Sequence, residues 1–236
     1  MQNHEMDAAR ALRIERNAMS DDVPEPSKGD LAHALAKAGL SIIPVVGGPA
    51  VELFQLLVQP PLERRRATWM EQVGKKLLEL EEKGLDLSKL QENDQFITAV
   101  MQASSAAIRT HQQAKLDALK NAIVQIAIGK APEETFQHLL LGFIDEFSEM
   151  HFRILAFAHA PVAPAGLSMG SLAHILEDNI PSLRGQNTLY NQLWKDLYVR
   201  GLVSTEGLNT TMSGSGLSQS RASPIGVTLL NFIAES

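Results

Sequence analysis

The chain has 236 residues, of which 44% are hydrophobic, 20% are charged and 5% are aromatic. This composition suits one large or two small folded domains, and the few aromatic residues favour helices packed through aliphatic side chains over a β-sandwich or barrel. The formal net charge of −6 argues against a protein that mainly coats nucleic acid, because neutralising phosphates requires an excess of Lys and Arg. The absence of cysteine excludes disulfides, thiolate metal sites and cysteine nucleophiles, and it makes the cytoplasm the expected location.

The N-terminal part is predicted to contain a flexible segment followed by a helix. Residues 1–29 form the flexible segment, which ends in the polar, acidic and proline-containing stretch SDDVPEPSKGD. A helical-bundle domain is expected over residues 30–160. Its first helix is indicated by apolar residues at helical spacing, namely Leu31, Ala34, Leu35, Ala38 and Ile42. Pro44 ends this helix because proline lacks the amide proton that the helix needs.

Residues 39–58, GLSIIPVVGGPAVELFQLLV, contain a single charged residue and are interrupted by two prolines and two adjacent glycines. A transmembrane helix needs about 20 uninterrupted apolar residues, so a conventional span is not expected. Three interpretations remain open: a buried helix–turn–helix hairpin, a surface for oligomerisation, or a segment that inserts into lipid after a trigger. We favour the buried hairpin, with Leu53, Phe54 and Leu57 in the core.

The middle of this stretch is the predicted hinge. Pro49 is expected at the first position of the second helix, and a positive φ is expected at one of two glycines because glycine alone adopts it without strain. The hinge and interaction candidates are Pro44, Gly47, Gly48 and Pro49.

Two prolines, Pro60 and Pro61, are predicted to end the second helix. An amphipathic helix then runs from Leu62 to about Lys83, with Gly84 as its C-terminal cap. Its first turn contains the sequence ERRR, the densest positive charge of the chain. Either this run contacts an anionic membrane surface, or its arginines are exposed helix charges that offset the acidic ELEEK sequence. The interaction candidates are Arg64, Arg65 and Arg66.

Two further helices complete the predicted bundle. The first is a single long helix from about Asp94 to Ile128, and the second begins at Pro132 and continues to Ile154. The predicted fold class is therefore mainly α, with a bundle of long helices followed by a smaller C-terminal domain.

Residues 165–236 change in character. Two short helices, SLAHILEDNI and NTLYNQLWKDLYVRG, precede a Gly/Ser-rich segment and the closing sequence SPIGVTLLNFI. This order resembles a winged-helix domain, in which LWKDLYVRGLV corresponds to the third helix and the start of the first strand of the wing. The resemblance implies a small α plus β-hairpin domain.

Winged-helix proteins that read DNA place basic and amide side chains on the third helix and at the wing. The corresponding candidates here are Asn187, Asn191, Gln192, Lys195 and Arg221. From Ser168 to Ser236, however, there are four basic and five acidic residues. Because phosphate contacts require positive charge, DNA binding is the alternative and not the leading hypothesis.

No catalytic, metal or cofactor residue is assigned. GLSMG fits the G-x-S-x-G pattern of a hydrolase, but PVAPA before it cannot be the strand that this pattern requires, so Ser168 or Ser171 is interpreted as a helix cap. His138, Asp145 and Glu149 share one helix face, yet His138 lies about 10 Å from Asp145 along the helix, too far for one metal shell. Neither a P-loop nor G-x-G-x-x-G occurs, so no nucleotide is expected, and His151 and His159 receive no role.

The layout of residues 38–236 resembles bacterial helical proteins of the abortive-infection alpha (Abi-alpha) type. The shared features are the interrupted apolar segment, long charged helices, a DEFSEMHFRIL-like helix that enters a small domain, and an IGVTLLNFI-like end. The resemblance implies a non-enzymatic role in phage defence or stress and supplies no catalytic residues.

The leading hypothesis is a bacterial cytoplasmic interaction protein that binds a protein partner or itself. One alternative is a winged-helix transcriptional regulator. A second alternative is an effector that inserts into membranes through residues 39–58.

Overall fold

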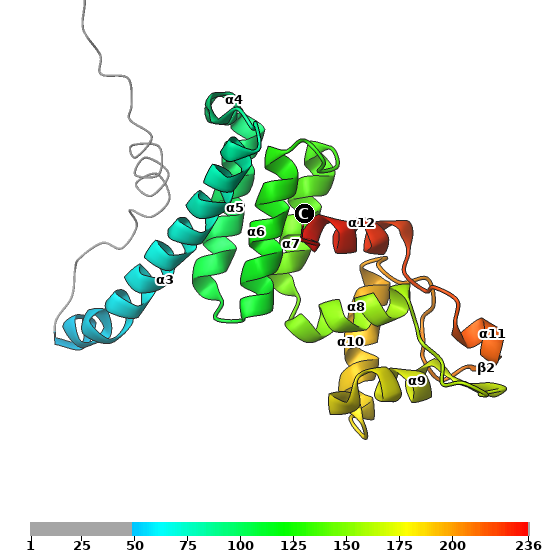
Figure 1. Ribbon diagram of the computed structural model, residues 1–236. Helices are drawn as coiled ribbons and strands as arrows, with labels where there is room; N and C mark the ends of the chain where they lie inside the picture. The colour runs from blue at the N-terminus through cyan, green and yellow to red at the C-terminus, as the bar shows by residue number, and fades with distance from the viewer. Residues whose placement is uncertain (1–48, 236) are drawn as a thin grey trace, which may run out of the picture. The chain divides into compact units, whose positions relative to one another are not determined.

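The computed structural model describes residues 49–235, and within this range the chain is mainly helical with one two-stranded antiparallel sheet (Figure 1). The predicted mainly-α fold class is therefore confirmed. Several predictions lie outside the described residues: the flexible segment 1–29, the helix before Pro44, and the turn at Gly47 and Gly48. Pro49 begins the first described helix, as its sequence position indicates.

Four helices form a bundle: α3 (Pro49–Glu82), α5 (Asp94–Arg109), α6 (Gln113–Ala127) and α7 (Glu134–Glu146). Helix α5 contacts α3, α6 and α7, and the short α4 (Leu87–Gln91) precedes it. Small side chains on α5 allow the neighbouring helices to come close, and large aliphatic side chains of α6 and α7 complete the core. The buried residues at these contacts include Ala99, Ala103, Ala106, Ala107, Leu119, Ile123, Leu140 and Ile144.

The predicted helix end at Pro60 and Pro61 is wrong, because α3 continues through both prolines. Neither proline has an amide proton to donate to the preceding turn, so two helical hydrogen bonds are missing there. Both prolines and the residues one turn before them are exposed. Water can therefore bind the freed carbonyl groups, and the helix tolerates the prolines.

The predicted single helix from Asp94 to Ile128 is also wrong, since it is divided into α5 and α6, which pack against each other. Thr110 and Gln112 are extended, with ψ values of 154° and 115°. The Thr110 hydroxyl accepts a hydrogen bond from the Gln112 amide at 3.2 Å, which stabilises the turn. Both helices bury their apolar residues in the same core, so the helical periodicity continues across the turn and conceals it.

The predicted helix from Pro132 to Ile154 is divided into α7 and α8 (Glu149–His159). Phe147 is extended at the corner and buried, and its ring stacks on Phe143 and His151 with centroid distances of 5.6 and 4.7 Å. The Ser148 amide donates to Nδ1 of His151 at 3.1 Å and so caps the new helix. This polar cap and the buried aromatic cluster stabilise a corner that periodicity alone does not indicate.

The C-terminal elements are α8, β1 (Met169–Ser171), α9 (Leu172–Asn179), the 3₁₀ helix η1 (Pro181–Leu183), α10 (Asn187–Val199), β2 (Thr211–Ser213), α11 (Gly214–Leu217) and α12 (Pro224–Ile233). Strand β1 pairs antiparallel with β2, and Met169 lies opposite Ser213. The paired strands are separated in sequence by α9 and α10, so no tight hairpin turn joins them. Val203 and Ala222 add an isolated antiparallel bridge.

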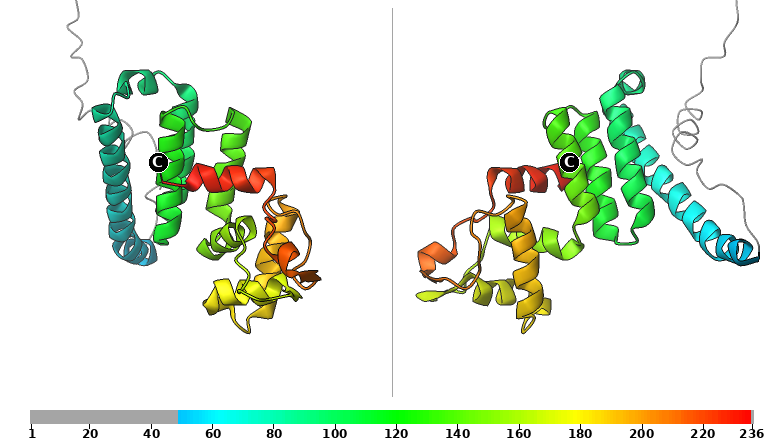
Figure 2. Two further views of the ribbon diagram at one scale, coloured as in Figure 1. Left: turned by 45° about the vertical axis from the view of Figure 1, so that its right-hand side comes forward. Right: turned by 180° about the vertical axis from the view of Figure 1, so that it is seen from behind.

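The closing helix α12 packs against α6 as well as α8 (Figure 2). Asn121 on α6 donates from its side-chain amide to the Ile233 carbonyl at 2.9 Å. At Gly226, an added Cβ would lie 2.2 Å from the Leu202 carbonyl oxygen, so only glycine allows this approach. Segments 112 residues apart in sequence are thereby joined, while the predicted domain limits of 30–160 and 165–236 remain predictions.

Candidate functional site on helix α3

Helix α3 has one buried stripe, which faces the bundle. Trp69 and Val73 on this stripe are 2% and 6% exposed. The Trp69 indole nitrogen donates to the Ser104 hydroxyl of α5 at 2.9 Å, so the polar atom of this buried ring has a partner. This contact fixes the orientation of α3 at the bundle.

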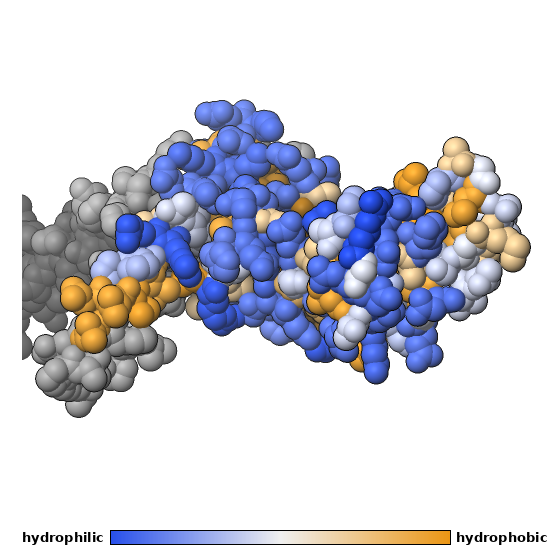
Figure 3. Space-filling view, turned by 90° about the horizontal axis from the view of Figure 1, so that it is seen from below, coloured by the Kyte–Doolittle hydropathy of each residue, from blue (hydrophilic) through white to orange (hydrophobic). Residues whose placement is uncertain are grey.

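A second apolar group lies on the other side of the same helix, nearer its N-terminus. Leu53, Leu56 and Leu57 are 57%, 72% and 63% exposed, and we call these three residues the α3 apolar surface. At about 100° per residue, they are rotated by about 120° to 160° from Trp69. Figure 3 shows a group of hydrophobic residues, coloured orange, at the N-terminal end of α3.

The expected burial of Leu53 and Leu57 in the core is therefore wrong. For Phe54 the structure describes the backbone but not the side chain. Two physical reasons act together. First, the leucines point away from the bundle. Second, this part of α3 extends beyond the bundle: Val58 lies on nearly the same side of the helix as Trp69, rotated by only about 20°, and is still 40% exposed.

The arginine candidates follow the two prolines after an interval of two residues. Arg64 and Arg65 are exposed and Arg66 is half-buried. Arg64 donates from Nε to the Pro60 carbonyl at 3.4 Å. Arg64 is rotated by about 20° from Leu57, so it extends the same side of the helix as the α3 apolar surface.

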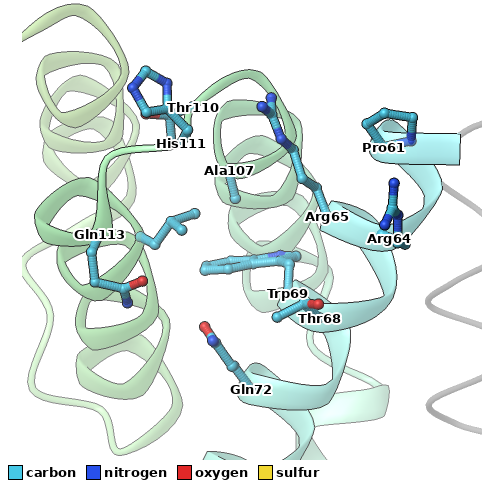
Figure 4. Close-up of a pocket in the computed structure, with 11 residues that line it drawn as sticks. Pro61, Arg64, Arg65, Thr68, Trp69, Gln72, Ala107, Thr110, His111 and Gln113 are labelled. Atoms are coloured by element: carbon cyan, nitrogen blue, oxygen red, sulfur yellow. The ribbon is translucent and has the colours of Figure 1, made fainter. Parts of the chain in front are cut away.

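A cavity of about 410 Å³ lies between α3 and the turn that joins α5 to α6, and we call it the α3 cavity (Figure 4). Its floor is apolar and includes Trp69, Ala107 and Leu116, while its rim carries Arg64, Arg65 and His111. The remaining lining residues are Pro61, Thr68, Gln72, Thr110 and Gln113. Two of the arginine candidates, Arg64 and Arg65, are thus brought next to residues that are about 40 positions away in sequence.

No membrane-spanning helix is found among the described helices, since none combines the required length and hydropathy. Within the same residues, no group of three His, Asp or Glu side chains has metal-binding geometry. Asp145 instead pairs with Arg109 of α5 at 2.5 Å.

The DNA-contact candidates on α10 are partly engaged inside the chain. The Asn187 side-chain oxygen accepts from the Tyr190 hydroxyl at 3.0 Å, and Gln192 donates to Asp196 at 2.7 Å. Asn191 is half-buried, and Lys195 is exposed.

Two residues outside α10, one of them a DNA-contact candidate, also have structural contacts. The guanidinium of Arg221 donates to the Gly216 carbonyl at 2.8 Å, so this candidate stabilises its own loop. Ser171 caps α9 by accepting from the His174 amide at 3.3 Å, as the capping interpretation predicts for this serine.

His151 is the residue whose role the sequence interpretation missed. It is 8% exposed, and its Nε2 lies 3.5 Å from Asp196 of α10. Burial lowers the pKa of His151, and the opposing effect of Asp196 is weaker. The spacing of Ser148 and His151, one helical turn apart, was the available signal for the cap.

No family model, curated protein or solved structure matches this chain. The functional argument therefore depends on the described surfaces of the protein.

Proposed function

We propose that this protein is a non-enzymatic interaction protein that self-associates through the α3 apolar surface. The observation that carries the proposal is the exposure of Leu53, Leu56 and Leu57 on one side of a continuous helix. Removing a leucine side chain from water contributes roughly 1.5 to 3 kcal/mol, so three adjacent leucines favour a covering partner.

A second copy of the chain suits this surface. Residues 53–62, LFQLLVQPPL, contain no charged residue, so two copies can pack here without removing a charge from water. Two identical helices related by a twofold axis present the same leucines to each other, as in most homodimers. An antiparallel pair centred midway between Leu53 and Leu57 places Leu53 of each copy opposite Leu57 of the other.

Lipid is a less suitable partner for the same side of the helix. A helix that lies in a membrane surface buries its apolar side and keeps its cations at the headgroups. Here Arg64 follows the leucines on the same side, so an in-plane helix would bury this charge with them. The net charge of −6 also disfavours approach to an anionic leaflet.

The test is the oligomeric state of the full chain, measured by sedimentation velocity over a range of protein concentrations. The wild type is expected to dimerise with increasing concentration. The triple variant Leu53→Ser, Leu56→Ser, Leu57→Ser is expected to stay monomeric with an unchanged melting temperature. Leu78→Ser is the matched control, because Leu78 is a 50% exposed leucine of the same helix. A wild type that stays monomeric up to its solubility limit refutes self-association, and flotation with liposomes that the triple variant abolishes supports lipid instead.

A bacterial defence or stress role extends this proposal and is supported by the Abi-alpha resemblance alone. We expect phage plating efficiency to differ between cells that express the wild type and cells that express the triple variant. Equal plating efficiency on both would separate self-association from defence.

A further inference from the structure

The α3 cavity has the size of a small-molecule site. Its volume of about 410 Å³ lies within the range of about 300 to 1,000 Å³ that is usual for ligand pockets. Three segments form it: α3, the C-terminal end of α5 and the beginning of α6. The site is therefore built by tertiary packing and not by one helix surface.

The rim of the α3 cavity is cationic. Arg64 and Arg65 lie on α3, and His111 lies across from them in the turn after α5 (Figure 4). Among the described residues that line the cavity, none carries a carboxylate.

Three other cavities of the described residues provide a comparison. Each includes carboxylates: Glu133 and Glu134 in one, Asp145 and Glu146 in the second, and Glu146 and Asp196 in the third. The α3 cavity differs from them in having positive side chains without acidic neighbours in its lining. An anion in it therefore meets attraction without a nearby repulsive charge.

Arg65 is available for a ligand, because it has no hydrogen bond or ion pair to another residue in the described part of the chain. In Figure 4 its side chain rises from α3 beside Ala107. A guanidinium presents parallel N–H donors that match the two oxygens of a carboxylate, phosphate or sulfonate.

The floor of the cavity is apolar and fixed in position. Trp69 is held by its bond to Ser104, and Leu116 lies on α6, which packs against α3. Gln113 at the edge is held by Asp117, to which it donates at 3.2 Å. A rigid apolar floor below a cationic rim favours a ligand with an apolar body and one anionic end.

We propose that the α3 cavity binds a small organic anion, in which a carboxylate or phosphate is attached to an apolar ring or short chain. The anionic group contacts Arg65, with Arg64 and His111 beside it. The apolar body packs over Trp69 and Leu116. The site shares no residue with the α3 apolar surface, so ligand binding and self-association are separate proposals and each can be refuted without the other.

The probe for the first experiment is 8-anilinonaphthalene-1-sulfonate, an anion with an aromatic body, titrated into the full-length protein. We expect saturable binding with energy transfer from tryptophan. Arg65→Gln is expected to weaken it about tenfold, since a hydrogen bond to a charged group is lost, and Arg65→Lys is expected to retain part of the affinity. Arg153→Gln is the matched control, because Arg153 is an exposed arginine on α8.

Two outcomes of this titration overturn the proposal. One is equal affinity of the wild type and Arg65→Gln, provided that circular dichroism shows both folded. The other is loss of binding in the triple leucine variant, because the probe would then occupy the α3 apolar surface.

Competition identifies the chemistry of the ligand. 1-Naphthylacetate and 1-naphthyl phosphate represent the two anionic groups, and the one that displaces the probe at lower concentration names the preferred group. Inorganic phosphate and neutral 1-naphthalenemethanol lack the apolar body and the charge, respectively, and are expected not to compete. Equal competition by the neutral alcohol would show that the rim arginines make no contribution, and it would refute the proposal.

Discussion

The two halves of α3 differ in where their large apolar side chains lie, although they belong to one helix. In the C-terminal half, Trp69 and Val73 are buried against the bundle. In the N-terminal half, the leucines are on the outer side, and nothing in the described residues covers them. The first half shows what holds the fold together, and the second shows where the fold leaves apolar surface for another molecule.

The largest expected effect breaks the buried half. Trp69→Ala removes a ring that is 2% exposed and leaves Ser104 without its partner. We expect a loss of about 3 to 5 kcal/mol in the free energy of unfolding, the usual cost of such a cavity. Urea denaturation is the measurement. Leu57→Ala, measured at a concentration where the protein is monomeric, is the comparison and should change stability by less than about 0.5 kcal/mol. Similar losses for both variants would show that the outer leucines are part of the core after all.

A second large effect extends the contrast between packed and open surfaces to the glycines. Gly226→Ala places a Cβ 2.2 Å from the Leu202 carbonyl, a backbone atom that no side-chain rotation can move away. We expect destabilisation of about 2 kcal/mol or more, because α12 must shift from its position. The measurement is the melting temperature, which should fall because the α12 contacts are weakened. An unchanged melting temperature would contradict the close approach of these segments.

The difference between prediction and structure follows the same division. Local signals were sufficient where one residue decides the backbone: Gly84 ends α3 with a φ of 101°, Pro49 begins it, and Ser171 caps α9. Periodicity identified the buried stripes but not the corners at Thr110 and Phe147, which lack Gly or Pro and are stabilised by side-chain contacts. It also could not show that the leucines near the N-terminus of α3 are exposed, because their exposure depends on where the bundle ends.

The candidate site was predicted only in part for a related reason. Arg64 and Arg65 were identified from charge density, which is a local property of the sequence. His111 and Leu116 line the same cavity, but they reach it only because α5 and α6 form a hairpin that the sequence interpretation treated as one helix. A wrong helix boundary therefore conceals a site, even when most helical residues are identified correctly.

The buried His151, at the contact between α8 and α10, predicts how stability depends on pH. Burial lowers its pKa below the usual value of about 6.5, and the charges that face it are Asp196, Glu146 and Lys115. The unfolded chain therefore takes up a proton at a pH where the folded protein does not, and stability falls as the pH decreases below about 6.5. In the folded state Nδ1 accepts from the Ser148 amide, which a protonated ring cannot do.

We expect the melting temperature of the wild type to fall between about pH 7.5 and pH 5.5, and that of His151→Gln to fall less. His138→Gln is the control, because His138 is exposed on α7. The same pH dependence in wild type and His151→Gln would contradict the assignment.

The smallest expected effect concerns the open surface. Gly142 lies inside α7, and an added Cβ would have nothing within 4 Å. Replacing a helical glycine by alanine restricts the unfolded chain and improves helix propensity, and where no neighbour is displaced the two effects add about 0.5 to 1 kcal/mol. Gly142→Ala should therefore raise the free energy of unfolding, in contrast to the same substitution at Gly226. Because the chemical change is identical at both positions, the difference in sign isolates the contribution of packing. A loss of stability at Gly142 would mean that a partner, such as a second copy of the chain, occupies the space next to α7 in solution.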